Sequence, residues 1–106
     1  MPLFRVYKDI FLDIKNGSKT IEVRNRLIRG DKAVFLCGRE VIRKDIKKVV
    51  QFNINDEFMK TNWKKIIPRA ENIKEAKQKL LSIFPNNNEF YAYYITDLTN
   101  SKRSEK

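Results

Sequence analysis

The stretch that decides the fold of this 106-residue chain is Gly17-Ser18-Lys19-Thr20-Ile21-Glu22-Val23-Arg24. From Lys19 onward it alternates polar with apolar residues, which is typical of a strand with one face in a core. We expect Ile21 and Val23 to point into that core. The polar residues of the strand are expected to share the opposite face: Thr20, Glu22 and Arg24. A carboxylate between two cations can position both of them, or act as a base beside a substrate that they hold. A surface ladder of salt bridges, of little value for stability, would use the same residues.

The apolar patterns on either side of this stretch predict the remaining elements. Alternating or continuous apolar runs predict strands at residues 4–7, 19–24, 33–37, 40–52 and 89–97. Helical spacing predicts helices at residues 10–15, 55–67 and 70–84. We expect Asn55 to cap the second helix, and strand 40–52 to bend or bulge near Lys44 and Asp45.

Helices inserted late into a run of strands predict the α+β class. Strands this short need closure or cover, so about five to six mostly antiparallel strands are expected to curl into a small barrel. Two to three helices would pack around that barrel. Residues 1–98 are expected to form this single domain, and the charged residues 99–106 are expected to form a mobile tail.

The balance of charge points to a polyanionic partner. The chain has 23 Lys and Arg against 13 Asp and Glu, a net charge of +10, and a domain so basic most often meets nucleic acid. Between Arg24 and Lys48 there are nine basic and three acidic residues, in strands and loops that do not favour such residues for structural reasons. A second basic stretch, residues 60–79, is mostly Lys on predicted helices and is interpreted as a solvated helix face.

Several chemistries are excluded by composition. The chain has no His, which removes imidazole bases, Ser-His-Asp triads and His-ligated metals. Its single Cys, Cys37, allows no intrachain disulfide and no multi-Cys zinc site. No apolar stretch approaches the length of a membrane span, and the N-terminus lacks the plan of a signal peptide. We therefore expect a cytoplasmic protein with no metal, no cofactor and no membrane partner.

The opening stretch resembles the signature G-x-K-x-x-E-x-R of the ASCH domain family, in the PUA-like superfamily. The resemblance also covers the order of elements from about Phe4 to Leu98. It implies a small PUA-like β-barrel with a cleft beside it, and Lys19, Glu22 and Arg24 at the edge of that cleft. Members of the family are generally described as binding RNA, which agrees with the charge of the chain.

The first functional hypothesis is therefore a module that binds RNA, or single-stranded nucleic acid more broadly. Phosphate contacts are expected from the motif and the Arg-rich stretch, namely Lys19, Arg24, Arg26, Arg29, Lys32, Arg43 and Lys44. The cleft is expected to contain Thr20, Glu22, Tyr91 and Tyr93, with the aromatic residues of the last strand as candidates for stacking on an unpaired base. The alternative is a purely structural role, in which these aromatic residues belong to the core.

The second hypothesis is a metal-independent hydrolase of a nucleoside or nucleic acid. Small bacterial proteins that this chain resembles in length are amidohydrolases of N4-acetylcytidine, described with a Lys, a Thr and a Glu as catalytic residues. Their Lys falls on Lys19, and the candidate for their Glu is Glu71. Their Thr falls on Glu22, because Thr20 does not have the required spacing, so Glu22 would serve as the acid or base. A third alternative, an adaptor for an acidic protein, has no residue that specifically favours it.

Overall fold

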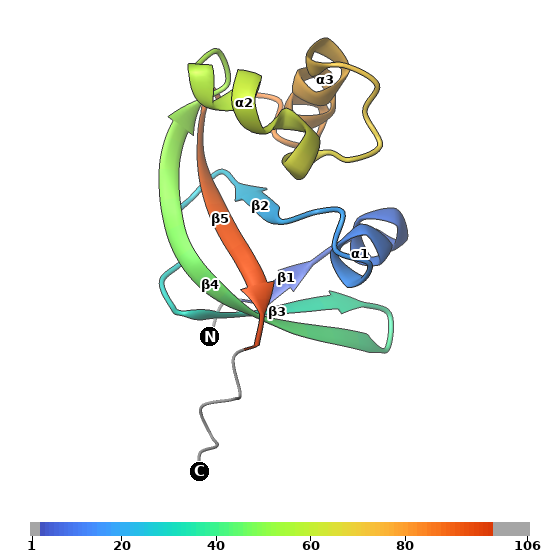
Figure 1. The fold of residues 1–106 in the computed structure, drawn as a ribbon. Coiled ribbons are helices and arrows are strands. Elements are labelled where there is room, and N and C mark those ends of the chain that lie inside the picture. The colour runs from blue at the N-terminus through green and yellow to red at the C-terminus, as the bar shows by residue number, and fades with distance from the viewer. Residues whose placement is uncertain (1–2, 99–106) are drawn as a thin grey trace.

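The computed structural model describes residues 3–98 as an α+β domain (Figure 1). Each predicted strand and helix is present, and the predicted strand 89–97 has the bounds that the alternation indicated. The predicted tail, residues 99–106, lies outside the described residues. The elements, in chain order, are β1 (Leu3–Arg5), α1 (Lys8–Lys15), β2 (Ile21–Arg24), β3 (Lys32–Cys37), β4 (Glu40–Asn53), α2 (Glu57–Ile66), α3 (Ile73–Ile83) and β5 (Glu89–Asp97).

The five strands form one mixed sheet in the order β1-β3-β4-β5-β2. Only the pair β1–β3 is parallel among these strands, and the other neighbours are antiparallel. Figure 1 shows the sheet curling around, so that it forms a half-barrel of the small PUA-like kind. The edge strands β1 and β2 are joined by a side chain, since the Arg24 guanidinium donates a 3.2 Å hydrogen bond to the Arg5 carbonyl.

The two faces of the sheet bury two separate cores. Ile21 and Val23 of β2 pack in the first core, together with residues of α2 and α3 such as Met59 and Leu80. The second core lies on the other face and has α1 against it. It contains Phe4, Ile14, Ala33, Phe35, Tyr93 and Ile95. The predicted inward direction of Ile21 and Val23 is thus confirmed, but the opposite face of β2 is covered as well, because Glu22 is buried there.

A bulge in β4 lets one strand serve both cores. The register with β5 shifts between Ile46, which pairs with Ile95, and Lys48, which pairs with Tyr94. An extra residue in one strand reverses the facing of everything that follows it. Ile46 before the bulge and Val49 after it therefore both pack against the second core. The irregularity was predicted near Lys44 and Asp45 and lies just beyond them.

All three helix starts differ from the prediction, and α1 begins at Lys8, two residues earlier than expected. The residue that precedes α2 as its N-cap is Asp56 rather than Asn55, whose backbone N–H donates to the Asn53 side chain in the turn after β4. Helix α3 begins at Ile73, three residues later than expected, because the Asn72 side chain caps it by accepting from the Glu75 N–H at 2.8 Å. Side-chain capping by Asn outweighs the helix propensity of the preceding Ala70.

Candidate functional site

Lys19 is buried where the start of β2 meets the end of α2, with 5% of its surface exposed. Its ammonium donates to the Ile21 carbonyl at 2.8 Å and to the Ile66 carbonyl, and it lies 3.5 Å from Glu22 Oε1. An ammonium has three N–H donors, so these three acceptors occupy all of them. The Ile66 carbonyl is at the C-terminus of α2, where a helix leaves carbonyls unpaired and its dipole favours a cation. Lys19 thus caps α2 and attaches it to the sheet.

Glu22 lies between two cations, as the sequence predicted. Its Oε1 faces Lys19, and its Oε2 accepts a 2.8 Å hydrogen bond from Arg24 Nε. The Arg24 guanidinium also lies over the Phe4 ring, 4.8 Å from its centroid. Together with the Arg24 hydrogen bond to Arg5, these contacts make a continuous polar connection from the end of α2, through β2, to β1. We call Lys19, Glu22 and Arg24 the motif cluster.

Burial changes the acidity of Lys19. Loss of solvent around the ammonium lowers the pKa of Lys19 below its usual value, while the charge and hydrogen bond of Glu22 act in the opposite direction. Lys19 therefore gives up its proton more readily than a lysine in water. Buried lysines with this property serve as bases or nucleophiles in enzymes.

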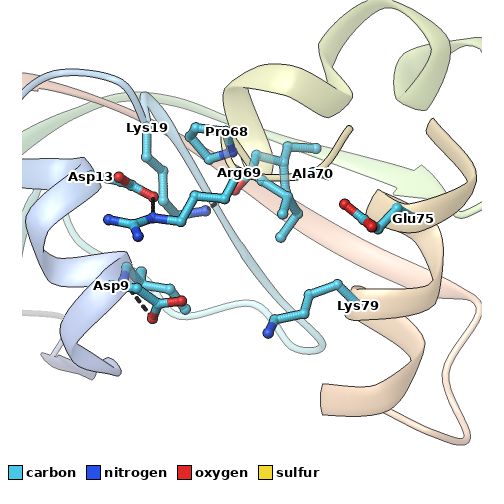
Figure 2. Close-up of a pocket in the computed structure, with 11 residues that line it drawn as sticks. Asp9, Asp13, Lys19, Pro68, Arg69, Ala70, Glu75 and Lys79 are labelled. Atoms are coloured by element: carbon cyan, nitrogen blue, oxygen red, sulfur yellow. Dashed lines mark hydrogen bonds and ion pairs between the residues drawn. The ribbon is translucent and has the colours of Figure 1, made fainter. Parts of the chain in front are cut away.

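Two adjoining pockets lie on either side of the Lys19 side chain. The helix pocket has a volume of about 300 Å³ and lies between α1 and the turn from α2 to α3 (Figure 2). The strand pocket, of about 120 Å³, lies beside β2, the end of β1 and the end of α3. The walls that the two pockets share are Ile10, Lys19, Ile66 and Ile67. The helix pocket has the volume of a small-ligand site, and both pockets combine apolar walls with a few charged groups, as such sites do.

The charges of the helix pocket are balanced. Among its described lining residues, three carboxylates face three cations: Asp9, Asp13 and Glu75 against Lys19, Arg69 and Lys79. Figure 2 shows Arg69 from the α2–α3 turn reaching Asp13 on α1, with Arg69 Nε 2.9 Å from Asp13 Oδ2. This ion pair joins the two walls of the pocket. Sequence reasoning missed it because its partners are 56 residues apart. The available signal was a charged Asp13 next to Ile14 on the inward face of the helix.

The structure does not bring the predicted phosphate contacts into one cleft. Lys19 and Arg24 line the strand pocket, and Arg26 lines a third pocket, described below. The remaining predicted cations lie elsewhere: Arg29 on the loop after β2, Lys32 on β3, and Arg43 and Lys44 on β4. Strand β4 is central in the sheet, whereas the motif cluster lies at an edge strand. In addition, Lys32 pairs with Asp45 at 2.8 Å and Lys44 pairs with Asp97 at 2.6 Å.

Tyr93 is fully buried in the second core, which corrects its assignment to the cleft. Its ring cannot stack on an incoming base. Its hydroxyl instead donates to the Arg26 carbonyl at 2.9 Å and accepts from the Ile28 N–H at 2.7 Å. Burial raises the pKa of Tyr93, which keeps this hydroxyl protonated as a donor. Tyr93 therefore holds in place the loop that carries Arg26.

Three further predicted site residues lie outside the two pockets. Thr20 is exposed, and Tyr91 is half-buried against the second core. Glu71 is exposed, and its backbone N–H donates to Glu75 Oε1 at 2.8 Å. None of the three is among the described residues that line the helix or strand pocket, and it is Glu75 that lines the helix pocket.

An aromatic residue that sequence reasoning missed lies at the strand pocket. Tyr7 was assigned to the first strand, but β1 ends at Arg5 and Tyr7 precedes α1 as its N-cap residue. Its side chain is 73% exposed and lines the strand pocket. The signal that could have found it is Asp9, an acidic residue that marks the first turn of a helix.

Among residues 3–98, no group of three or more His, Cys, Asp or Glu residues is arranged to hold a metal ion. Within the same residues, no helix has the length and apolar character needed to cross a membrane.

Comparison with solved structures places the fold among ASCH proteins. The ASCH protein from Zymomonas mobilis superposes with a TM-score of 0.70 at 18% identity, over 90% of this chain and 66% of that one. The hypothetical protein PH0355 superposes with a TM-score of 0.71 at 17% identity, over 91% of this chain and 97% of that one. No family model and no curated protein matches the sequence. The resemblance that the motif indicated is confirmed at the level of the fold.

Proposed function

We propose that this protein binds single-stranded RNA and that the helix pocket receives one base turned out of the strand. The observation that supports this most directly is the pocket itself, a volume of about 300 Å³ with apolar walls and balanced charge, in a protein of net charge +10. A nucleobase is a flat, neutral group with donors and acceptors on its edges, which suits such a pocket. The anionic backbone of the strand would remain outside, on the basic surface.

The pocket favours an unpaired base over a duplex. Bases within a helix are stacked and present only their edges, so a pocket that encloses a whole base requires one that is unpaired or flipped out. In this proposal the apolar Ile10 and Ile67, which are only partly buried, contact the faces of the base. The carboxylates and cations around them contact its edge.

Lys19 has a different role in this proposal from that of a surface lysine. Its donors are occupied by Ile21, Ile66 and Glu22, so it forms part of the wall and holds Glu22 in position. Phosphate contacts are assigned to Arg24 and Arg26, which both line the third pocket, at the end of β2. Arginine suits that task, because its planar fork matches phosphate oxygens.

Isoleucine methyl signals in NMR spectra test this proposal. Adding single-stranded RNA at low salt should shift the signals of Ile10 and Ile67, and should leave Ile42 on β4 unchanged as an internal control. A duplex of the same sequence should bind more weakly. Absence of binding to any RNA at low salt, or shifts confined to Ile42, would overturn the proposal.

A pair of substitutions on one helix gives a matched test of the pocket. Lys79 and Lys74 are both exposed on α3, but only Lys79 is among the residues that line the helix pocket. Lys79→Glu should weaken RNA binding more than Lys74→Glu, although both change the net charge by the same amount. Equal effects of the two variants would indicate attraction by net charge alone, without a role for the pocket.

A second candidate function, a metal-independent amide hydrolase of an acylated nucleoside, is favoured by one observation. Burial lowers the pKa of Lys19, which lies between the two pockets and beside a carboxylate. A neutral Lys19 keeps two N–H donors, enough for the carbonyls of Ile21 and Ile66, and has a lone pair that can take a proton. In this candidate Lys19 is the base, Glu22 exchanges the proton, and Glu75 replaces Glu71 as the carboxylate at the substrate.

Acetate release from N4-acetylcytidine tests this second candidate. Wild-type protein should release acetate, and Lys19→Met should not, while circular dichroism confirms that the variant is folded. Glu71→Gln should keep the activity and Glu75→Gln should lose it. If the wild-type protein binds RNA but releases no acetate, the protein is a binding module and this candidate is wrong.

A further inference from the structure

A third pocket adjoins the two pockets at the motif cluster. The rim pocket, of about 390 Å³, is lined by Leu3, Arg24, Asn25, Arg26, Ile28 and Phe84. It shares Arg24 and Phe84 with the strand pocket, just as the strand pocket shares Lys19 and its neighbours with the helix pocket. The three pockets therefore lie next to one another in a series, and each shares walls with the next.

This series follows β2 along the open side of the half-barrel. The helix pocket begins at Lys19, just before β2, and the rim pocket lies at Arg24, where β2 ends. A strand rises about 3.3 Å per residue, so the series extends over more than one nucleotide-sized site. Strands β1 and β2 are the two edges of the sheet, so the series runs along a side that no strand pairing closes.

The charge of the lining residues rises from balanced at the helix pocket to a net of +2 at the strand pocket and at the rim pocket. The described residues that line the helix pocket are balanced, whereas the strand pocket has three cations, Arg5, Lys19 and Arg24, against the single carboxylate of Glu22. The rim pocket has Arg24 and Arg26 and, among its described lining residues, no carboxylate. A strand with one neutral base enclosed at the first end and its phosphates toward the other end complements this gradient.

Exposed apolar side chains border the positive part of the series. Tyr7 and Ile83 both line the strand pocket, the first from the start of α1 and the second from the end of α3. Leu3 lines the rim pocket, and all three are among the large apolar residues that the protein exposes. Exposed aromatic rings next to cations are the surfaces on which unpaired bases stack.

We infer that the helix, strand and rim pockets form one track for three consecutive nucleotides of a single strand. The first base is enclosed in the helix pocket. The second base stacks on Tyr7, over the strand pocket. The third nucleotide lies in the rim pocket against Phe84, and Arg24 and Arg26 bind the phosphates that link it to the second. This inference rests on the proposed RNA-binding function and specifies the ligand of the same site.

Calorimetric titration with single-stranded RNAs of one, two, three, four and six nucleotides tests the track. Affinity should rise with each nucleotide up to three and then level off, apart from the statistical gain of longer strands. Tyr7→Ala should weaken trinucleotide binding about tenfold, within the range for loss of one stacked base, and leave mononucleotide binding unchanged. Tyr7→Trp should restore the affinity.

Leu12→Ala is the matched control for Tyr7→Ala, because Leu12 is an exposed apolar residue of α1 that lines none of the three pockets. It should leave all affinities unchanged. A mononucleotide that binds as tightly as a trinucleotide would overturn the track and leave the proposed function standing. Affinity that keeps rising in equal steps beyond three would do the same. Absence of binding at every length would overturn the track and the proposed function together.

Discussion

The motif cluster and the central strand β4 are both rich in charged side chains. Those of the motif cluster are largely buried and paired, whereas several of those on β4 are exposed. Lys19 and Glu22 are each 5% exposed and are fixed by short polar contacts. On β4, Arg43 and Lys47 are exposed to solvent. In the first region each charge depends on its partners for stability. In the second, the charges contribute mainly to the long-range field of the protein, which salt screens.

The order of the strands explains this difference. Strand β2 is an edge strand between two cores, with α2 above its start, so its polar face is enclosed. Strand β4 is in the centre of the sheet, and the residues before its bulge alternate between the second core and solvent. Arg24 and Arg43 belong to one basic stretch of sequence, but the β3–β4 hairpin carries Arg43 away from the motif cluster.

Glu22→Ala should give the largest contrast between the two regions. It leaves the buried ammonium of Lys19 without its carboxylate, and breaking a buried ion pair typically costs about 3–5 kcal/mol. Arg43→Ala should change the free energy of unfolding by no more than about 0.5 kcal/mol, as surface substitutions do. Urea unfolding of the two variants measures both values. A loss below about 1 kcal/mol for Glu22→Ala would mean that the cluster behaves like a surface ladder.

The pH dependence of stability should distinguish Lys19 from an exposed lysine. Because burial lowers its pKa, Lys19 loses its proton in the folded state at a pH where the unfolded chain, with a value near 10.5, still keeps it. The unfolded state then binds more protons, so stability rises with pH through that window. Relative to Lys19→Met, the wild-type protein should therefore gain stability in urea titrations as the pH rises toward 10.5.

Lys47→Met, at an exposed position of β4, is the control for this pH experiment. Its difference from the wild-type protein should stay flat over the same range. A flat difference for Lys19→Met as well would show that the buried ammonium keeps its ordinary acidity in the folded protein.

The salt dependence of RNA binding should separate the two regions functionally. Each phosphate contact on a single strand contributes about 0.7 to the slope of log K against log salt concentration. Arg26→Ala should reduce that slope by about 0.7, whereas Arg43→Ala should leave it unchanged. Fluorescence anisotropy at several salt concentrations measures both slopes. If Arg43→Ala has the larger effect, the strand lies across β4 and not along the pockets.

The smallest effect is expected at the end of β5, where Asp97 pairs with Lys44 of β4. Lys44 lowers the pKa of Asp97, so their ion pair adds stability above the unfolded value of 3.8 and loses it as pH falls through the lower folded value. Asp97 is almost fully exposed, and its pair is worth little. Asp97→Asn should shift the urea midpoint slightly at pH 6 and not at pH 2. A shift as large as that of Glu22→Ala would remove the contrast between the two regions.

Local sequence patterns predicted the secondary structure of each segment and the facing of its side chains. They did not predict which distant segment contacts it. The alternation in β2 predicted the facing of Ile21, and the spacing of the motif predicted Glu22 between two cations. The acceptor that Lys19 finds at Ile66 is 47 residues away, and no local period contains that information. The same holds for the pair of Asp13 with Arg69.

Two aromatic residues show that local patterns also fail to predict exposure to solvent. Period-two alternation correctly predicts that Tyr93 lies in a strand, but it does not say that both faces of that strand are covered. Tyr7 shows the opposite error. Its neighbours have the alternation of a strand, but Tyr7 lies at the start of a helix, where its ring is exposed to solvent. Residue type and period predict the element, whereas exposure depends on how the layers assemble.

The bulge in β4 implies an unusual tolerance at position 47. Alternation along a strand decides which face each residue occupies, and Lys47 is an extra residue that the pairing of β4 with β5 passes over between Ile46 and Lys48. Replacing Lys47 by almost any residue should be harmless, since its side chain is exposed. Deleting it would place Lys48 directly after Ile46, keep the pairs of Lys48 with Tyr94 and of Val49 with Tyr93, and so leave the facing of Val49 and Val50 unchanged. Position 47 thus contributes a local bend and twist of β4 rather than a side-chain contact.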